Sequence, residues 1–186
     1  GPKRISVWNA ATGELVRELF GPAQYGATGG AINPQDPSLM VGQGCEWRLD
    51  PDSGKAACVG VITRRPMGIS RFAEGPDGRL YLFVGHGWLH GPHPLDIYLR
   101  RGDADYQLVA TFRYAGSNRA TYSTTYWADE NGDGEVQPQE ETTVPQRFAF
   151  GGWYLGVTPD LSLYTMSGDP FQIQLDGFTE CGAPQY

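Results

Sequence analysis

Turn-forming residues interrupt this chain too often for long helices. Its 186 residues include 26 glycines and 14 prolines, and neither residue is well tolerated inside a helix. Short runs rich in β-branched and aromatic residues lie between the interruptions, and some of them alternate polar with apolar side chains, as residues 46–50 do. Such runs at a spacing of about 8–12 residues are typical of all-β sandwiches, barrels and propellers. The sequence therefore predicts a single all-β domain over residues 1–186, large enough to bury a substantial core.

The predicted strands fall into successive hairpins. In the first hairpin, the candidate inward positions are Ile5, Val7, Leu15 and Leu19. The expected strands cover residues 5–19 (as two strands), 38–41, 46–50, 56–62, 71–72, 79–85, 95–100, 106–114, 122–127, 153–157, 161–166 and 171–175.

Two hairpin patterns recur along the chain. A turn with Thr/Ser-Gly, a charge and an apolar strand occurs at residues 9–15 and 50–56, and Pro-Asp before an apolar-Tyr strand occurs at 76–81 and 159–164. Alternating the two patterns gives four-stranded units of about 40–45 residues, which is the period of a propeller blade. Residues 71–114 are the clearest unit.

These hairpins resemble known blade sequences. Residues 76–81, Pro-Asp-Gly-Arg-Leu-Tyr, with the strands that follow them, resemble the blades of bacterial NHL-like β-propellers, and residues 9–16 resemble the outer hairpin of quinoprotein-like blades. The resemblance implies a β-propeller-like array of about four antiparallel blades, the lower limit for propellers. The first unit begins at its third strand, which leaves open a piece of a longer propeller or a different β fold that uses the same hairpins.

Residues 129–140 match a calcium-loop template position by position. Ca²⁺ takes about 6–8 oxygen ligands, and the template draws them from positions 1, 3, 5, 7, 9 and 12 with a glycine at position 6. Gly134 occupies the sixth position, and the alternative is a solvated turn without an ion. The predicted ligands are Asp129, Asn131, Asp133, Glu135 (through its backbone carbonyl), Gln137 (through a water) and Glu140.

The surroundings of this loop indicate a structural ion rather than a calcium sensor. Sensor loops lie between two helices that move on binding, whereas residues 122–127 before this loop have the composition of a strand. Pro138 can start a short helical turn, which residues 142–145 then end. Residues 127–134 with the following Pro-x-Glu resemble a calcium-loop insertion of large secreted bacterial β proteins.

Charge and cysteine content narrow the partners and the compartment. The formal net charge of -7 argues against nucleic acid, and no apolar run reaches the length of about 18–20 residues that a membrane span needs. Cys45 and Cys58 flank a predicted turn and are the favoured disulfide, with Cys181 bonded to either as the alternative. Calcium and a disulfide together favour an extracellular or periplasmic protein.

Two further groups of residues are candidates for binding. His86, His90 and His93 could hold a transition metal, although a surface loop shaped by glycine and proline is the more ordinary interpretation. Aromatic rings near loops or strand ends could stack on a sugar beside the calcium loop, or could instead be buried in the core. The candidate ligand-binding rings are Trp88, Trp127, Trp153 and Tyr154.

No catalytic signature stands out in the sequence. There is no Gly-x-Ser-x-Gly elbow and no phosphate-binding loop. We therefore expect a non-catalytic, calcium-binding, extracellular module that binds glycan or protein and forms part of a larger chain. The alternative is a domain of a polysaccharide-active hydrolase or lyase, or of a quinoprotein-like oxidoreductase.

Overall fold

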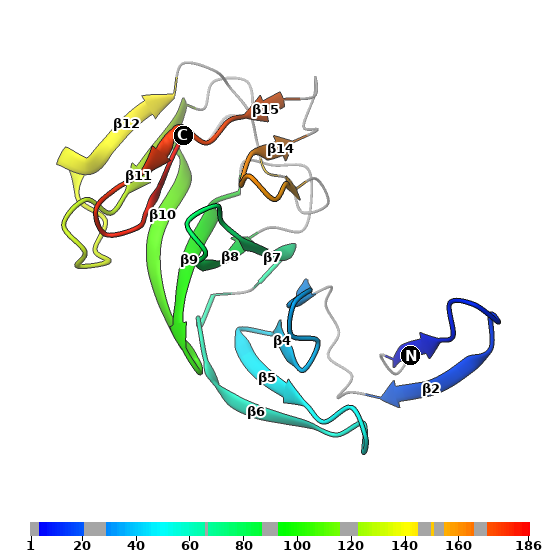
Figure 1. Cartoon of the computed structure of the whole chain (residues 1–186). Helices are drawn as coiled ribbons and strands as arrows, with labels where there is room; N and C mark the ends of the chain where they lie inside the picture. Colours follow the sequence, from blue (N-terminus) through cyan, green and yellow to red (C-terminus); the bar gives the residue numbers. More distant parts are fainter. Residues whose placement is uncertain are drawn as a thin grey trace.

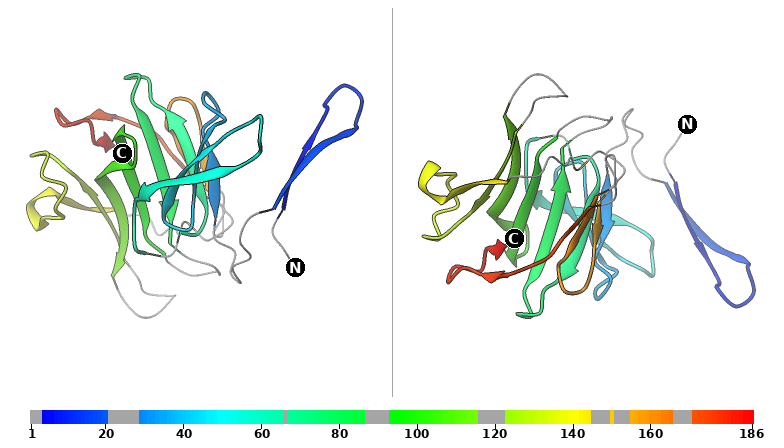
Figure 2. Two further views of the ribbon diagram at one scale, coloured as in Figure 1. Left: turned by 90° about the horizontal axis from the view of Figure 1, so that it is seen from below. Right: turned by 90° about the horizontal axis from the view of Figure 1, so that it is seen from above.

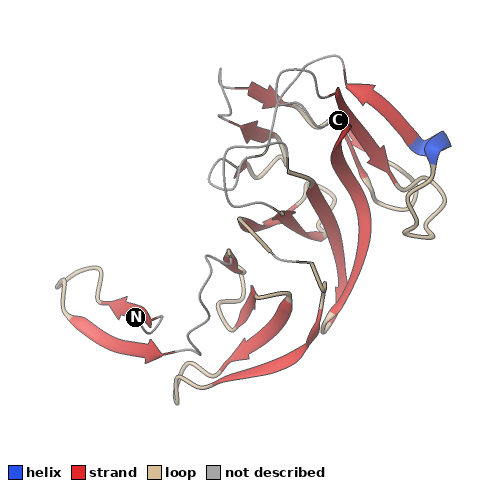
Figure 3. Ribbon diagram, turned by 180° about the vertical axis from the view of Figure 1, so that it is seen from behind, coloured by secondary structure: helices blue, strands red, loops and turns tan. Residues whose placement is uncertain are grey.

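The computed structural model describes residues 4–20, 29–65, 67–86, 93–115, 123–144, 150, 155–165 and 171–186. Within these ranges the chain forms antiparallel sheets joined by tight turns, with one short 3₁₀ turn as its helical element. Figure 3 shows how little of the described chain is helical. The predicted all-β class is confirmed.

The strands pair almost entirely with their neighbours in the chain. Four of the sheets have the orders β1-β2, β3-β4-β5-β6, β13-β14-β15 and β16-β17, and the largest has the order β12-β11-β10-β9-β8-β7. The elements are β1 (Arg4–Trp8), β2 (Leu15–Phe20), β3 (Gly30–Ile32), β4 (Leu39–Gly42), β5 (Cys45–Leu49), β6 (Ala56–Val61), β7 (Ser70–Glu74), β8 (Leu80–Gly85), β9 (Leu95–Gly102), β10 (Asp105–Ala115), β11 (Ser123–Ala128), η1 (Pro138–Glu140), β12 (Glu141–Val144), β13 (Gly156–Val157), β14 (Leu163–Thr165), β15 (Phe171–Ile173), β16 (Gly177–Phe178) and β17 (Pro184–Gln185).

The six-stranded sheet is the centre of the molecule and is covered on both faces. On one face, Phe72, Leu82 and Tyr98 lie opposite one another on β7, β8 and β9 and belong to a cluster with Leu39 and Val41 of β4. A sheet packed on both faces requires strands that are apolar at successive positions. Strand β8 has this character, because all its residues after Leu80 are buried.

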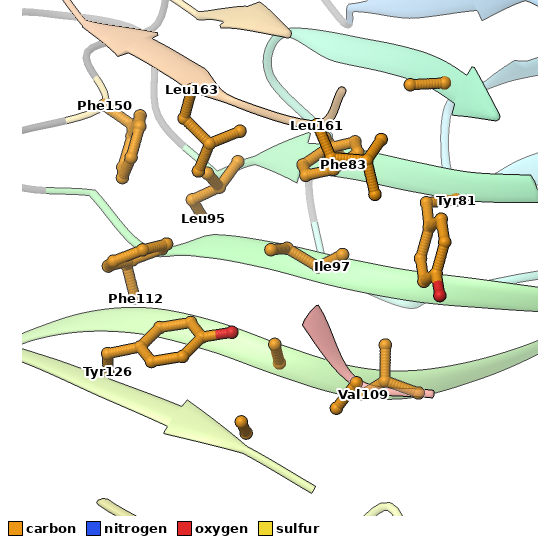
Figure 4. Close-up of a cluster of buried hydrophobic side chains, with 14 of the residues drawn as sticks. Tyr81, Phe83, Leu95, Ile97, Val109, Phe112, Tyr126, Phe150, Leu161 and Leu163 are labelled. Atoms are coloured by element: carbon orange, nitrogen blue, oxygen red, sulfur yellow. The ribbon is translucent and has the colours of Figure 1, made fainter. Parts of the chain in front are cut away.

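The other face of the central sheet packs against the C-terminal strands. Tyr81, Phe83 and Ile97 point to this face and share a buried cluster with Leu161 and Leu163. Figure 4 shows these side chains interleaved between the central sheet and the segment around β14. The β3–β6 sheet, the central sheet and the C-terminal strands are thus stacked face to face along an arc (Figure 1).

The β1–β2 hairpin stands apart from these layers. Figure 2 shows it as a separate ribbon in both views. Val7 and Leu15, which were expected to face inward, have exposed fractions of 43% and 46%. The predicted hairpin exists, but the expectation that Val7 and Leu15 face inward is wrong. The side chains of Ile5 and Leu19, the other two expected inward positions, lie outside the described residues.

The structure also corrects the predicted four-stranded unit at residues 71–114. Strands β7 to β10 do form there, but β11 and β12 extend the same sheet to six strands. Residues 141–144, where the sequence indicated only the end of a helical turn, form β12. The described sheets do not close into a barrel or a propeller.

The predicted disulfide is not formed, and Cys45, Cys58 and Cys181 are all free thiols. Cys45 and Cys58 do lie on paired strands, as expected from the intervening turn. However, Cys58 faces Trp47 across the pair, whereas Cys45 faces Val61, with an irregularity in register beyond Glu46. The pKa of the Cys45 thiol is raised by burial and by the neighbouring Cys58 thiol.

Candidate functional site

The predicted calcium loop connects two adjacent strands of the central sheet. Strands β11 and β12 pair antiparallel, with Trp127 opposite Glu141, and residues 129–140 link them. The 3₁₀ turn η1 begins at Pro138 and ends at Glu140, which confirms the predicted helical start after the loop. Both ends of the loop are therefore held by one ladder of backbone hydrogen bonds.

Asp129, the first residue of the template, is the buried centre of the loop. Its exposed fraction is 0%. Oδ1 accepts a hydrogen bond from the Gly132 amide at 2.6 Å, and Oδ2 accepts one from the Gly134 amide at 2.9 Å. Gly132 and Gly134 have φ angles of 82° and 70°, which a residue with a Cβ adopts only at a cost. These glycines allow the chain to turn back around the carboxylate.

Asn131 and Asp133, the third and fifth residues, fold back over the same turn. Asn131 Oδ1 accepts the Asp133 amide at 2.9 Å, and Asp133 Oδ1 accepts the Glu135 amide at 2.7 Å. Asp133 Oδ2 accepts hydrogen bonds from the side-chain amides of Asn131 at 3.0 Å and Gln137 at 2.5 Å. Four of the predicted ligand residues are thus in one hydrogen-bonded chain.

Glu140, the twelfth residue, closes the loop from the other end. It is buried, and its Oε1 accepts the Glu130 amide at 3.2 Å. Its Oε2 accepts a hydrogen bond from the Trp127 indole at 2.7 Å. The Trp127 ring has an exposed fraction of 0%, so it belongs to the core and cannot act as the sugar platform that was considered for it.

The polar side chains of the loop offer only carboxylate and amide groups, and Ca²⁺ prefers oxygen ligands of these kinds. Among the described residues, no group of three or more His, Cys, Asp and Glu side chains is arranged to hold a metal ion. At Asp133, the amide nitrogens of Asn131 and Gln137, and not their oxygens, approach the carboxylate. Rotating either terminal amide would present oxygen, but it would end the hydrogen bond that Asn131 Oδ1 accepts from the Asp133 amide or the one that Gln137 Oε1 accepts from Gln139. The donor set thus has the chemistry that Ca²⁺ prefers, while the described side chains are not arranged around an ion.

Two residues outside the template also hold the loop, and the sequence did not reveal them. Gln107 on β10 donates its side-chain amide to Asp129 Oδ2 at 3.1 Å and to the Gly132 carbonyl at 2.9 Å. Thr179, after β16, donates its hydroxyl to the Asp129 carbonyl at 2.9 Å. They lie far from the loop in sequence, and no local pattern links them to it.

A second polar cluster lies between the central sheet and the β3–β6 sheet. Asp96 on β9 has an exposed fraction of 1%. Its carboxylate contacts His86 Nε2 at 2.7 Å and accepts hydrogen bonds from Thr111 Oγ1 at 2.7 Å and the Tyr98 hydroxyl at 3.2 Å. Arg65 NH1 lies 3.5 Å from Asp96 Oδ2. His86, one of the three histidines predicted as possible metal ligands, thus contacts a buried carboxylate.

The charge state of Asp96 follows from these contacts. Burial alone would raise the pKa of Asp96, but the hydrogen bond and charge of His86, the Thr111 hydroxyl and the charge of Arg65 outweigh it and hold the pKa below the ordinary 3.8. The carboxylate is therefore ionised at neutral pH. His90 and the predicted ligand-binding residues Trp88, Trp153 and Tyr154 lie outside the described residues.

A further buried carboxylate joins the same two sheets. Glu46 on β5 has an exposed fraction of 0%. It accepts hydrogen bonds from Arg100 Nε at 3.1 Å, Arg100 NH2 at 3.2 Å and the Tyr106 hydroxyl at 2.6 Å. In the Glu46–Arg100 pair, one guanidinium presents two donors to one carboxylate, which is the geometry of a strong ionic hydrogen bond. It fixes how the β3–β6 sheet sits on β9 and β10.

None of the described residues forms a helix long and apolar enough to cross a membrane. The chain matches no protein-family model, and no curated protein aligns with it significantly.

Proposed function

We propose that this chain is a non-catalytic, calcium-stabilised β module of an extracellular or periplasmic protein, built from propeller-like blades, that binds a glycan or a protein ligand. The single observation that carries the proposal is the arrangement around Asp129. A carboxylate that is fully removed from water is costly unless it is neutralised or richly hydrogen-bonded. The Asp129 carboxylate lies in a turn shaped by glycines, and the polar side chains of that turn carry oxygen atoms that can act as metal ligands.

In this proposal the ion takes its ligands from residues that already face the turn. Asp129, Asn131 and Asp133 supply side-chain oxygens, Glu135 a backbone carbonyl, and Gln137 a bridging water, while Glu140 contributes lone pairs not used by its Trp127 and Glu130 contacts. Each carboxylate oxygen has more than one acceptor position, so the hydrogen bonds of Asp129 and Glu140 are compatible with an ion. The bound cation joins β11 to β12 and stabilises the edge of the central sheet.

Thermal unfolding tests this proposal. Adding Ca²⁺ to chelator-treated protein should raise the melting temperature, because an ion that binds only the folded state stabilises it by mass action. Asp133→Ala should abolish the response, whereas Asp52→Ala, in an exposed turn remote from this loop in sequence, should keep it. A melting temperature that is unaffected by both chelator and Ca²⁺ would eliminate the calcium role.

The ligand-binding part of the proposal is supported by the exposed apolar side chains of the β1–β2 hairpin. Trp8 and Val16 have exposed fractions of 58% and 63%. An isolated two-stranded ribbon with such side chains is unusual for a surface that meets only water. The net charge of -7 favours a neutral or basic partner rather than a polyanion. A Trp8→Ser variant should lose binding in a glycan-array or protein pull-down assay and keep its melting temperature.

The second candidate, an enzyme domain acting on polysaccharide, is favoured by the His86–Asp96 pair. A buried carboxylate that orients an imidazole is a recurrent feature of general acid–base sites. Incubation with a polysaccharide panel separates the candidates. Product formation that disappears in His86→Gln would establish the enzyme, whereas saturable binding without products would support the binding module.

A further inference from the structure

The C-terminal hairpin, residues 176–186, lies directly on the candidate cation loop. We propose that this hairpin is a latch for the loop, so that cation binding at Asp129 and docking of the hairpin strengthen each other. The inference rests on the proposed calcium function, and it identifies which distant residues would set the affinity for the ion.

Thr179 makes the central contact between hairpin and loop. Its hydroxyl donates to the Asp129 carbonyl at 2.9 Å and accepts the Ala183 amide at 3.0 Å. One hydroxyl thus joins the first residue of the calcium template to the turn of the hairpin. Without it, the Asp129 carbonyl would lose a partner at the point where the buried strand β11 ends.

Cys181 makes the second contact. Its thiol donates to the Glu130 carbonyl at 3.4 Å. A Cβ placed on Gly132 would lie 3.1 Å from Cys181 Sγ, so the thiol is packed closely against the loop backbone. The hairpin therefore touches three positions at the start of the loop: residues 129 and 130 through hydrogen bonds and 132 through packing.

The far side of the hairpin is fixed to the core, which makes the latch firm. The Tyr81 hydroxyl donates to the Gly182 carbonyl at 2.8 Å, and the Tyr126 hydroxyl donates to the Pro184 carbonyl. Ala183 has an exposed fraction of 0%. These contacts set the hairpin in one position, and the loop residues that it touches are held in that position as well.

Thermodynamic linkage turns this contact into a prediction. If the docked hairpin favours the loop shape that binds the ion, the bound ion must favour the docked hairpin by the same factor. Cys181 reports the docked state, because its half-buried thiol is less accessible to a reagent while it packs against the loop than after the hairpin has left it. Ca²⁺ should therefore protect Cys181 from alkylation, and weakening the Thr179 contact should weaken Ca²⁺ binding.

Two measurements test the latch. Calorimetric titration with CaCl₂ should give a dissociation constant about 3- to 10-fold higher for Thr179→Val than for wild type, the size expected for losing one or two hydrogen bonds. Thr179→Ser keeps the hydroxyl and should bind like wild type. In a Cys45→Ser, Cys58→Ser background, iodoacetamide labelling of Cys181 should slow severalfold when Ca²⁺ is added.

The outcomes distinguish this inference from the proposed function. Wild-type protein that takes up no Ca²⁺ overturns both. Wild-type protein that binds Ca²⁺, with an unchanged affinity in Thr179→Val or with a Cys181 labelling rate that Ca²⁺ does not alter, overturns the latch alone. Circular dichroism of each variant confirms that it is folded before the affinities are compared.

Discussion

Individual buried polar residues carry much of the specificity of this fold. Trp127, Glu140, Glu46 and Asp96 are each almost completely removed from water, and each finds its partner on another strand or at the far end of a loop. A buried polar group costs free energy when its partner is lost. Single substitutions that delete only the partner should therefore reveal these contacts.

Replacing Trp127 with Phe should destabilise the protein by about 1–3 kcal/mol, because Glu140 Oε2 would lose its indole donor inside the structure. Urea unfolding measures the change. Trp47→Phe is the matched control, since the Trp47 indole donates to the Gly42 carbonyl at 3.1 Å from a half-buried position and water can take over that role. Equal losses for the two variants would contradict the special role of the Trp127–Glu140 bond.

Glu46→Gln should remove the buried countercharge of the Arg100 guanidinium, leave it only the exposed Asp103 carboxylate at 2.7 Å, and lower the free energy of unfolding by about 2–4 kcal/mol, slightly below the range for a fully buried pair. Glu74→Gln, on an exposed position of β7, should change little. If the two substitutions have the same effect on the urea midpoint, the Glu46–Arg100 pair does not hold the two sheets together.

At the scale of elements, burial divides the strands into two classes. Strand β8 is buried along nearly its whole length, whereas β1 and β2 expose apolar side chains to solvent. A side-chain hydrogen bond joins Arg17 of β2 to the Pro51 carbonyl in the turn before β6. The free energy of local opening should therefore be higher for β8 than for β1 and β2.

Hydrogen exchange followed by mass spectrometry should therefore find amides of β8 and β9 protected by orders of magnitude more than those of β1 and β2. The reason is that opening the central strands exposes both apolar clusters, while opening the hairpin exposes side chains that are already in water. Comparable protection in both regions would mean that the hairpin is covered by another surface in solution.

At the scale of the whole molecule, several carboxylates link stability to pH in the same direction. Hydrogen bonds from Ser38 lower the pKa of Asp36, and those from Arg48 and Arg100 lower the pKa of Asp103. The buried Asp96 is shifted the same way despite its burial. A group whose pKa is lower in the folded protein stabilises it fully above the unfolded pKa, and that contribution is lost as pH falls through the folded value.

The urea midpoint should therefore change little between pH 7 and about 5 and decrease steeply below about pH 4, where the unfolded carboxylates take up protons first. Asp96→Asn should make this acid dependence shallower, because one shifted carboxylate is removed. Asp105→Asn, on an exposed residue, is the control. A slope below pH 4 that is the same in wild type and Asp96→Asn would show that Asp96 does not contribute to the acid transition.

Local patterns were sufficient to predict much of this molecule. The turn residues around 50–54 and 75–78 and the β-branched runs beside them predicted the hairpins β5–β6 and β7–β8 correctly, because glycine and aspartate act within a few residues of themselves. The calcium template likewise selects Asp129, Gly134 and Glu140 by their spacing within a single loop. The proposed calcium chemistry is of this local kind.

Only the tertiary structure decided which residues meet across the sheets. Residues 141–144 became a strand because β11 offered them an open edge, and Trp127 became a core ring because its neighbours on the sheet are covered. Cys45 and Cys58 were left unbonded by the register of β5 on β6, which places Val61 rather than Cys58 opposite Cys45. Gln107 and Thr179 reached the loop from a neighbouring strand and from the C-terminal hairpin. Such contacts depend on how whole sheets stack, and the free energy that selects one stacking is spread over many distant side chains rather than written in any short stretch of sequence.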